Sequence, residues 1–224
     1  MSRSAQFFLL VLAPALSLVL ALLGVETLSD NVMGWPLLIL GIAYPATAIS
    51  AYCIRKVPFW QAAGRVLHEE QGDRSFWGIL PGMIGAFFAS PLEYMYMGAL
   101  LPRSMTLQIA GLVLLAVGTA LGAWARYALR GSHSGHVQVT AEQALVIRGP
   151  YCLMRHPSYA GFLLVSAGIA VGYSSLLGLA AIGLLLLPAL AYRIRVEETL
   201  LERRFGEPYH AYQNRVRKLF PGIW

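Results

Sequence analysis

Long apolar runs make up most of this chain, and short polar segments separate them. Six of the runs approach the length of about 20 residues that an α-helix needs to cross a bilayer. The pattern therefore predicts an all-α polytopic membrane helical bundle with about six transmembrane helices. The predicted spans cover residues 5–25, 34–54, 76–100, 104–128, 158–173 and 174–192.

Composition and charge agree with a membrane protein. The chain is 57% hydrophobic and 12% charged, which differs from ordinary soluble domains. Its net charge of +6 does not indicate nucleic acid, because the basic residues flank the apolar runs and do not form one basic domain. Their distribution places both termini in the cytoplasm, at the inner membrane if the chain is bacterial. No cleavage site follows the first apolar run, so we expect it to remain as a helix.

The last two predicted spans form a C-terminal helical hairpin. Gly172-Tyr-Ser-Ser175 leaves almost no loop between them, so the start of one span and the end of the other lie at the same membrane depth. This brings His156 close to Arg193. Glycines four residues apart also allow helix backbones to approach closely in lipid. These pairs are Gly78 and Gly82, Gly118 and Gly122, and Gly168 and Gly172.

Polar groups gather at the open end of this hairpin. The segment Arg148–Tyr159 precedes it, and Arg193 and Glu197 follow at helical i, i+4 spacing. The pair alone is more typical of a solvated surface contact than of a functional site. Glu198 is rotated by about 100° from Glu197, so we expect the two carboxylates to face different sites. Glu93 lies inside the third span, where a carboxylate is either functional or at the membrane interface.

The residue types at this end suit a zwitterionic ligand that carries a nucleoside. The first turn of a helix beginning at Pro157 offers free N–H groups to a carboxylate. Glu197 is suited to an ammonium group or ribose hydroxyls. The rings of Tyr151 and Tyr159 are suited to adenine or to a sulfonium cation.

Two motifs flank the predicted hairpin: Gly149-Pro-Tyr-Cys-Leu-Met-Arg-His-Pro-Ser-Tyr159 and Arg193-x-x-x-Glu-Glu-x-x-Leu-x-x-x-Phe-Gly-x-x-Tyr-x-x-Tyr212. Over roughly residues 135–221 they resemble the isoprenylcysteine carboxyl methyltransferase family, and the related phospholipid methyltransferases share parts of the pattern. The resemblance implies one membrane domain, residues 1–224, that uses S-adenosyl-L-methionine. Within it, residues 1–130 would shape the substrate site and residues 131–224 would form the cofactor-binding core.

The resemblance also implies roles for individual residues. Arg193 and Glu197 would be catalytic, and Arg193 would contact the substrate. Glu93 is a further candidate for substrate binding, or for the base that an amine acceptor needs. The positions that match the cofactor site are His136, Gln143, Ala144, Leu145, Val146, Tyr151, His156, Pro157, Ser158, Tyr159 and Glu197.

The implied reaction is methyl transfer to a lipid-like or membrane-partitioning acceptor, with the carboxylate of a prenylcysteine-type substrate favoured. Alternatives are N-methylation of a phospholipid headgroup, S-methylation of a small thiol, or a transporter or scaffold that keeps the motif as structure. No metal is expected, because His133 and His136 lack a completing cysteine or carboxylate. The glycine-rich motif of nucleotide-binding soluble domains is absent from the sequence. The oligomeric state stays open.

Overall fold

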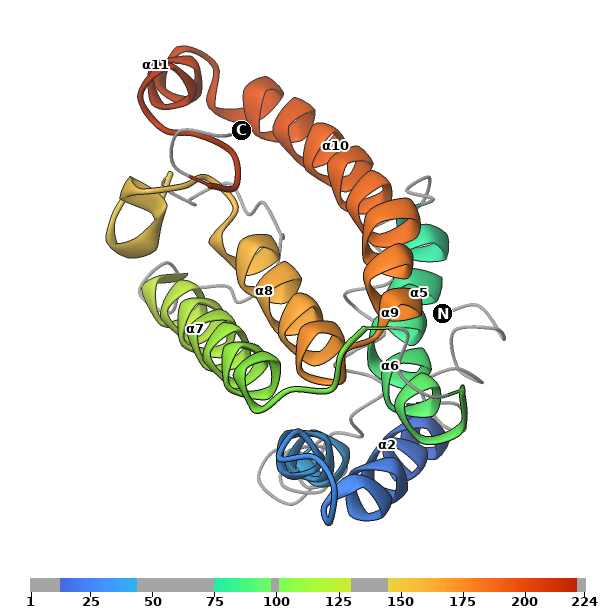
Figure 1. Ribbon diagram of the computed structural model, residues 1–224. Helices are drawn as coiled ribbons and strands as arrows, with labels where there is room; N and C mark the ends of the chain where they lie inside the picture. Colours follow the sequence, from blue (N-terminus) through green and yellow to red (C-terminus); the bar gives the residue numbers. More distant parts are fainter. Residues whose placement is uncertain (1–12, 44–74, 98–100, 130–144, 221–224) are drawn as a thin grey trace, which may run out of the picture.

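The computed structural model describes residues 13–43, 75–97, 101–129 and 145–220, and these form a bundle of helices (Figure 1). The N-terminal part holds α2 (Ala13–Thr27) and a helix over Gly34–Ala43. The central and C-terminal helices are α5 (Ser75–Ile84), α6 (Ser90–Leu92), α7 (Met105–Leu129), α8 (Pro157–Gly172), α9 (Leu176–Ala181), α10 (Leu187–Phe205) and α11 (Glu207–Arg215).

Two helices are built from α and π segments in succession. The π-helical turn Gly85–Ala89 joins α5 to α6, and a second π turn, Glu93–Met97, follows α6. A third π turn, Ile182–Leu186, joins α9 to α10, so that Leu176–Phe205 is one helix of 30 residues. At about 1.5 Å per residue this helix is longer than the roughly 30 Å hydrocarbon core of a bilayer. Its charged last third, which starts at Arg193, therefore has room to project beyond the apolar stretch.

A helix lies in each of the six regions that the sequence predicts as spans. Two of them, Met105–Leu129 and Leu176–Phe205, are long and apolar enough to cross a membrane. The helices Ala15–Thr27, Gly34–Ala43 and Pro157–Gly172 are apolar but shorter. The first two predicted spans extend into residues outside the described part. Large apolar side chains point outward from the long helices, as lipid contact requires, among them Ile109, Val113, Val117, Leu184 and Leu185.

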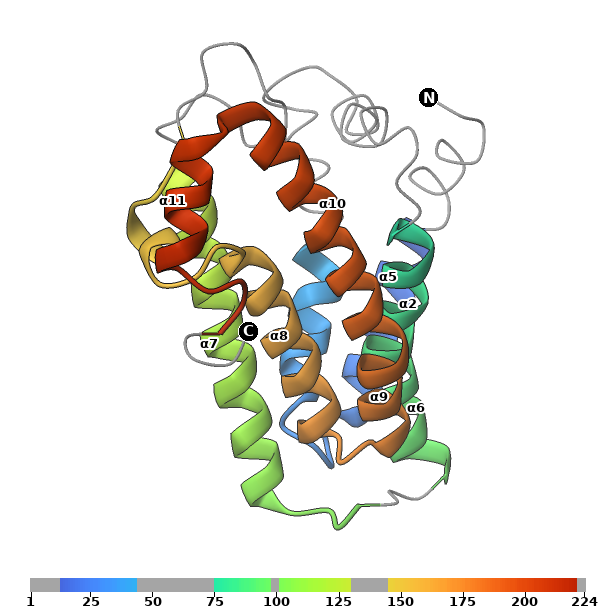
Figure 2. The same ribbon diagram turned by 90° about the horizontal axis from the view of Figure 1, so that it is seen from above.

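The C-terminal hairpin is present as predicted. Tyr173 and Ser174 turn the chain between α8 and α9, with Ser174 at a φ of 51°. Both views in Figures 1 and 2 show α8 and the α9–α10 helix side by side, so the first residues of α8 and the later turns of α10 lie toward the same end. One apolar core joins the two helices through Leu163, Leu186 and Leu190.

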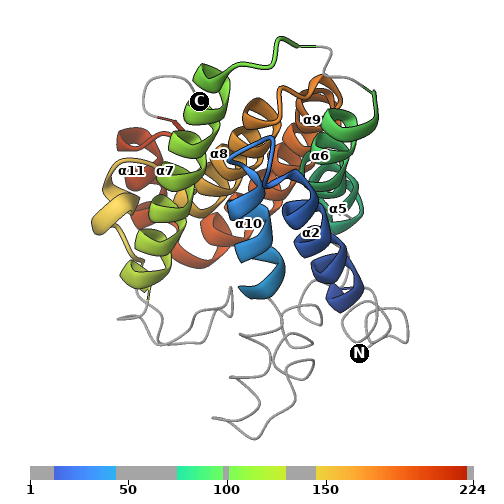
Figure 3. The ribbon, with the colours of Figure 1, turned by 60° about the horizontal axis from the view of Figure 1, so that its bottom comes forward.

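The N-terminal helices cover the opposite end of the hairpin. In Figure 3, α2 and the helix after it lie along one face of the bundle, and the turn between them points toward the closed end of the hairpin. Leu20, Met33 and Leu37 pack there against Tyr94 and Tyr173 in a second core. The Thr27 hydroxyl hydrogen bonds with that of Tyr173 at 2.8 Å. This end is therefore closed by packing, whereas the His156 end is built from polar groups.

The chain after Gly206 forms a helix that the sequence pattern did not predict. Gly206, at a φ of 56°, ends α10. However, Pro208 does not terminate helical structure; it lies in the first turn of α11. Figure 2 shows α11 folding back toward the start of α8.

Glycines bring α7 and α8 into close backbone contact, as the small-residue spacing predicts. A Cβ added at Gly118 would lie 2.6 Å from the Gly161 carbonyl oxygen, and one at Gly111 would lie 2.6 Å from that of Gly168. A Cβ at Gly122 would meet nothing within 4 Å. The two members of the Gly118 and Gly122 pair therefore differ, because only the first has no room for a side chain.

We expect Gly118→Ala to destabilise the protein by about 1–3 kcal/mol, because the methyl group forces the two backbones apart. Gly122→Ala is the matched control, and it should be neutral or slightly stabilising because alanine favours the helix. Thermal unfolding of the two variants in the same detergent measures the difference. Equal midpoints would show that α7 and α8 do not depend on this contact.

Candidate functional site

The segment before α8 is a compact turn. Gly149, at a φ of 64°, begins a 3₁₀ turn that ends at Cys152. Pro157 occupies the first position of α8, and the preceding His156 makes no side-chain cap to the helix. The N-terminus of α8 is therefore left with donor groups and a positive dipole end next to a buried imidazole.

The C-terminal tail holds this turn in place. Its residues pair with the segment before α8 in an isolated parallel bridge between Met154 and Arg217. The Arg155 N–H donates to the Arg217 carbonyl at 2.8 Å, and the His156 N–H donates to the Lys218 carbonyl at 2.9 Å. The hydroxyl of Tyr212 on α11 donates to the Tyr151 carbonyl at 2.6 Å. The tail thus closes the site on the side away from the bundle.

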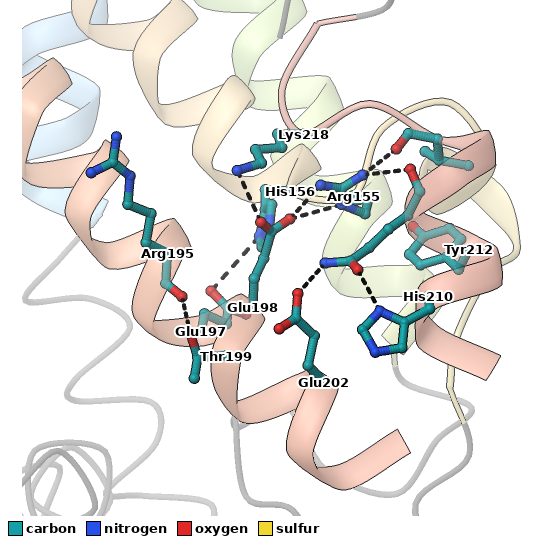
Figure 4. A network of polar contacts seen from close by, with 12 residues as sticks. Arg155, His156, Arg195, Glu197, Glu198, Thr199, Glu202, His210, Tyr212 and Lys218 are labelled. Atoms are coloured by element: carbon teal, nitrogen blue, oxygen red, sulfur yellow. Dashed lines mark hydrogen bonds and ion pairs between the residues drawn. The ribbon is translucent and has the colours of Figure 1, made fainter. Parts of the chain in front are cut away.

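Glu198 is the centre of a buried charge cluster (Figure 4). Its Oε1 accepts the Arg155 Nε–H at 2.8 Å, and the Arg155 Nη2 lies 2.6 Å from the same oxygen. The Lys218 Nζ lies 3.1 Å from Oε2, and the His156 Nε2 lies 3.4 Å from Oε1. Burial raises the pKa of this carboxyl, but hydrogen bonds from His156, Arg155 and Lys218 overcome that effect and lower it to about 2. Glu198 is therefore a carboxylate at every physiological pH.

Glu197 lies on the other side of the same imidazole. Its Oε2 is 3.8 Å from the His156 Nδ1, whereas Glu198 faces Nε2. The expectation that the two glutamates face different sites thus needs correction. The rotation of about 100° between them separates the carboxylates, but the histidine ring lies between them and contacts both.

Tyrosines line the remaining side. The Arg193 Nε–H donates to the Tyr159 hydroxyl at 3.2 Å, and the His156 and Tyr159 rings stack with centroids 5.7 Å apart. The Tyr151 hydroxyl interacts with the Ser158 side chain. Burial raises the pKa of Tyr151, so its hydroxyl stays protonated at neutral pH and is able to donate a hydrogen bond.

Two buried polar atoms at this end have no hydrogen-bond partner within the described part of the chain. They are the Glu197 Oε2 and the Tyr209 hydroxyl oxygen. Burial followed by the nearby Glu198 charge raises the pKa of Tyr209, so its hydroxyl remains protonated. An acceptor beside His156 and a donor near the charge of Glu198 thus lack hydrogen bonds, and buried polar groups ordinarily have partners. A polar ligand with its own donors and acceptors would satisfy both atoms.

The structure brings together most of the predicted site residues that it describes. Tyr151, His156, Pro157, Ser158 and Tyr159 lie at the start of α8, and Arg193 and Glu197 lie beside them on α10. Leu145 and Val146 are half-buried in the extended segment before Gly149. His136, Gln143 and Ala144 lie outside the described residues. Among the described residues, no group of three or more His, Cys, Asp or Glu side chains is placed to hold a metal ion.

Glu93 does not belong to this group. Its carboxylate accepts the Ser175 hydroxyl, the Leu176 N–H at 3.2 Å and the Leu177 N–H at 2.9 Å. These donors begin α9, at the closed end of the hairpin and away from His156. Glu93 is 1% exposed, and it caps this helix instead of reaching the polar site. The role of Glu93 in substrate binding or as a base therefore loses its geometric support.

Arg155, Glu198, Tyr209 and Lys218 belong to the site but were not among the predicted residues. Arg155 stands next to His156 in the first motif, and Glu198 stands next to Glu197 in the second. The sequence therefore offered one signal for Arg155 and Glu198: each stands next to a predicted site residue, and the two carry opposite charges. The tail residues carried no such signal, because their contact depends on the path of α11.

Comparisons with known proteins give a consistent result. Residues 106–208 match the family model for phospholipid methyltransferases. A probable protein-S-isoprenylcysteine O-methyltransferase of Oryza sativa subsp. indica is 32% identical over 115 residues, which are 50% of this chain and 60% of the relative. Protein-S-isoprenylcysteine O-methyltransferase B of Arabidopsis thaliana is also 32% identical over 115 residues and is covered to 58%. The alignments thus span less than two thirds of these relatives.

The fold agrees with a solved structure over nearly the whole chain. A eukaryotic intramembrane Ras methyltransferase, isoprenylcysteine carboxyl methyltransferase, matches with a TM-score of 0.58 at 20% identity. The match covers 94% of this chain and 74% of the other. It therefore extends to the N-terminal part that the family model, matched over residues 106–208, leaves out.

Proposed function

We propose that the chain is a member of the isoprenylcysteine carboxyl methyltransferase family and that it transfers a methyl group from S-adenosyl-L-methionine to a lipid-like or membrane-partitioning acceptor. The family-model match, the relatives and the shared fold support this proposal. The favoured acceptor is the carboxylate of a prenylcysteine-type substrate. The observation that supports this most is the placement of Glu197, whose buried Oε2 has no hydrogen-bond partner among the described residues and lies 3.8 Å from the His156 Nδ1. A cofactor with ammonium and hydroxyl donors fits such an acceptor.

The cofactor would be held by the residues at the start of α8, by Glu197, and by the segment before the turn. Bound S-adenosyl-L-methionine supplies a methyl group already activated on a sulfonium. The chain's own residues have the remaining tasks of binding, orienting the acceptor and excluding water, and orientation alone is worth roughly 7–11 kcal/mol. The full proposed set is His136, Gln143, Ala144, Leu145, Val146, Tyr151, His156, Pro157, Ser158, Tyr159 and Glu197.

The charge arrangement favours a carboxylate acceptor over an amine. A carboxylate needs no base, and the Arg193 guanidinium beside Tyr159 would orient it. An amine acceptor must first lose a proton. Glu93, the carboxylate considered for that step, is bound at the other end of the hairpin, and hydrogen bonds lower the pKa of Glu198 to about 2, which makes it a weak base. The family-model match to phospholipid methyltransferases keeps headgroup N-methylation as the second candidate.

The proposed topology has six spans and both termini in the cytoplasm. The polar site then lies at the cytoplasmic surface, where a soluble cofactor and a lipid anchor both reach it. Residues 1–130 would shape the acceptor site, and residues 131–224 would form the cofactor-binding core. A prenylated substrate, such as the plant relatives' names describe, would enter from the membrane.

Thermal stabilisation of the detergent-purified protein by S-adenosylhomocysteine tests this function. Ligand at 100 times its Kd stabilises a protein by about 2.7 kcal/mol. A shift would establish the cofactor site, and methyl transfer to a farnesylcysteine, a phosphatidylethanolamine or a small thiol would then identify the acceptor. A well-folded sample without any shift would favour a transporter or scaffold.

We expect Arg193→Ala to keep the cofactor-induced shift but to lower turnover by at least about tenfold, because the acceptor loses a charge-assisted contact worth roughly 1.5–3 kcal/mol. Calorimetry with S-adenosylhomocysteine and initial rates with a farnesylcysteine measure the two effects separately. Arg193→Lys is the control, since it keeps the charge but not the guanidinium hydrogen bond to Tyr159. Loss of cofactor binding in the alanine variant would move Arg193 from the acceptor side to the cofactor side.

A further inference from the structure

Neither oxygen of the Glu198 carboxylate is available to contact a ligand. Its carboxylate is surrounded by Arg155, Lys218 and His156, and the residue is only 6% exposed. Glu197, the adjacent residue, has a buried oxygen without a hydrogen-bond partner among the described residues. The two glutamates therefore have different tasks at one imidazole.

The contact with Glu198 determines which nitrogen of His156 carries the proton. A carboxylate only accepts hydrogen bonds, so the contact from Nε2 to Oε1 at 3.4 Å requires hydrogen on Nε2. In the neutral ring, Nδ1 then carries a lone pair. Nδ1 lies 3.8 Å from the Glu197 Oε2. With the ring in this neutral form, two buried acceptors stand side by side, and a group that satisfies both must donate twice.

We infer that Glu198 is a positioning residue: it keeps His156 in the Nε2–H form, and this makes Nδ1 and the Glu197 Oε2 a paired acceptor for donor groups of the cofactor. Arg155 and Lys218 take part by holding the charge of Glu198. A ligand with an ammonium group or neighbouring hydroxyls matches the pair. The identity of that ligand rests on the proposed function, whereas the state of the ring does not.

The nitrogen resonances of the His156 ring test the positioning directly. Protein with ¹⁵N-labelled histidine gives separate signals for protonated and unprotonated ring nitrogens, and His156→Asn identifies the relevant pair among the five histidines. We expect the wild type to carry hydrogen on Nε2 and to leave Nδ1 unprotonated. Glu198→Gln should change this distribution and weaken S-adenosylhomocysteine binding by about tenfold. A merely structural residue would leave the ring signals of the folded variant unchanged.

Two further variants make the result specific. Glu202→Gln is the matched control, because Glu202 lies on the same helix and accepts a hydrogen bond from Gln213 at 2.7 Å, away from His156. It should leave both readouts unchanged. If Glu198→Gln does not fold, Lys218→Met replaces it, since this variant keeps the Arg155 contacts. We expect Lys218→Met to shift the ring signals and to weaken binding in the same direction, by about threefold.

The outcomes separate this inference from the proposed function. Two outcomes would overturn the positioning role and leave the cofactor site intact. In the first, the wild type binds S-adenosylhomocysteine with hydrogen on the His156 Nδ1. In the second, folded Glu198→Gln shows unchanged ring signals. Hydrogen on Nε2 without any binding would overturn the proposed function and the paired acceptor with it, although Glu198 would still set the state of the ring.

Discussion

Glu197→Ala should abolish most of the stabilisation by S-adenosylhomocysteine while the ligand-free protein stays folded. The buried Oε2 has no hydrogen-bond partner in the described part of the chain, so its removal breaks no hydrogen bond to that oxygen. Binding loses a charge-assisted contact and one half of the acceptor pair beside His156. A residue kept for function at some cost to stability behaves in this way.

The expected loss of ligand stabilisation in Glu197→Ala follows from mass action. If the Kd rises 100-fold, ligand that stabilises the wild type by about 2.7 kcal/mol stabilises the variant by about 0.4 kcal/mol. Thermal unfolding with and without ligand measures both effects in one experiment. Glu202→Ala is the control, because this glutamate binds Gln213 on α11 and should keep the full ligand shift. A full shift in Glu197→Ala would exclude Glu197 from the cofactor site.

The positions of the helices were predictable because apolar runs locate them along the chain. The predicted span 104–128 is α7 at Met105–Leu129, and 158–173 is α8 at Pro157–Gly172. Pro157 marked the start of α8 correctly, because the proline ring fixes φ and the missing N–H is not needed in the first turn of a helix. By contrast, α11 has nine residues and a weak pattern, and so short a helix forms only through tertiary contacts.

The polar residues were less predictable because their roles depend on distant partners. A carboxylate in a span is read as functional when its partners are unknown, but the donors of Glu93 come from Ser175, Leu176 and Leu177, more than 80 positions along the chain. The angular rule separated Glu197 from Glu198 correctly on the helix. It could not show that one imidazole is placed to contact both.

Arg155→Met should destabilise the polar end of the protein by about 3–5 kcal/mol, the usual effect of removing one partner from a buried ion pair. Arg155 is 9% exposed and joins three parts of the chain. Its guanidinium binds Glu198 on α10, donates to the Gln213 carbonyl on α11 at 3.1 Å, and donates to the Val216 carbonyl at the start of the tail. The variant leaves a buried carboxylate with fewer donors and two carbonyls that lose the donor Arg155 supplied.

Arg195→Met separates this effect from a general loss of positive charge. Arg195 lies on the exposed side of α10, and Figure 4 shows it directed away from the cluster. Its replacement should change stability by no more than about 0.5 kcal/mol. Thermal unfolding compares the two variants, and limited proteolysis of the region that follows Gly206 shows where the loss occurs. Because Arg155 holds both α11 and the tail, cleavage should accelerate there before the apolar helices unfold. If Arg155→Met unfolds and is cleaved like Arg195→Met, the backbone bridge from Arg155 and His156 to the tail holds the site closed without the buried charges.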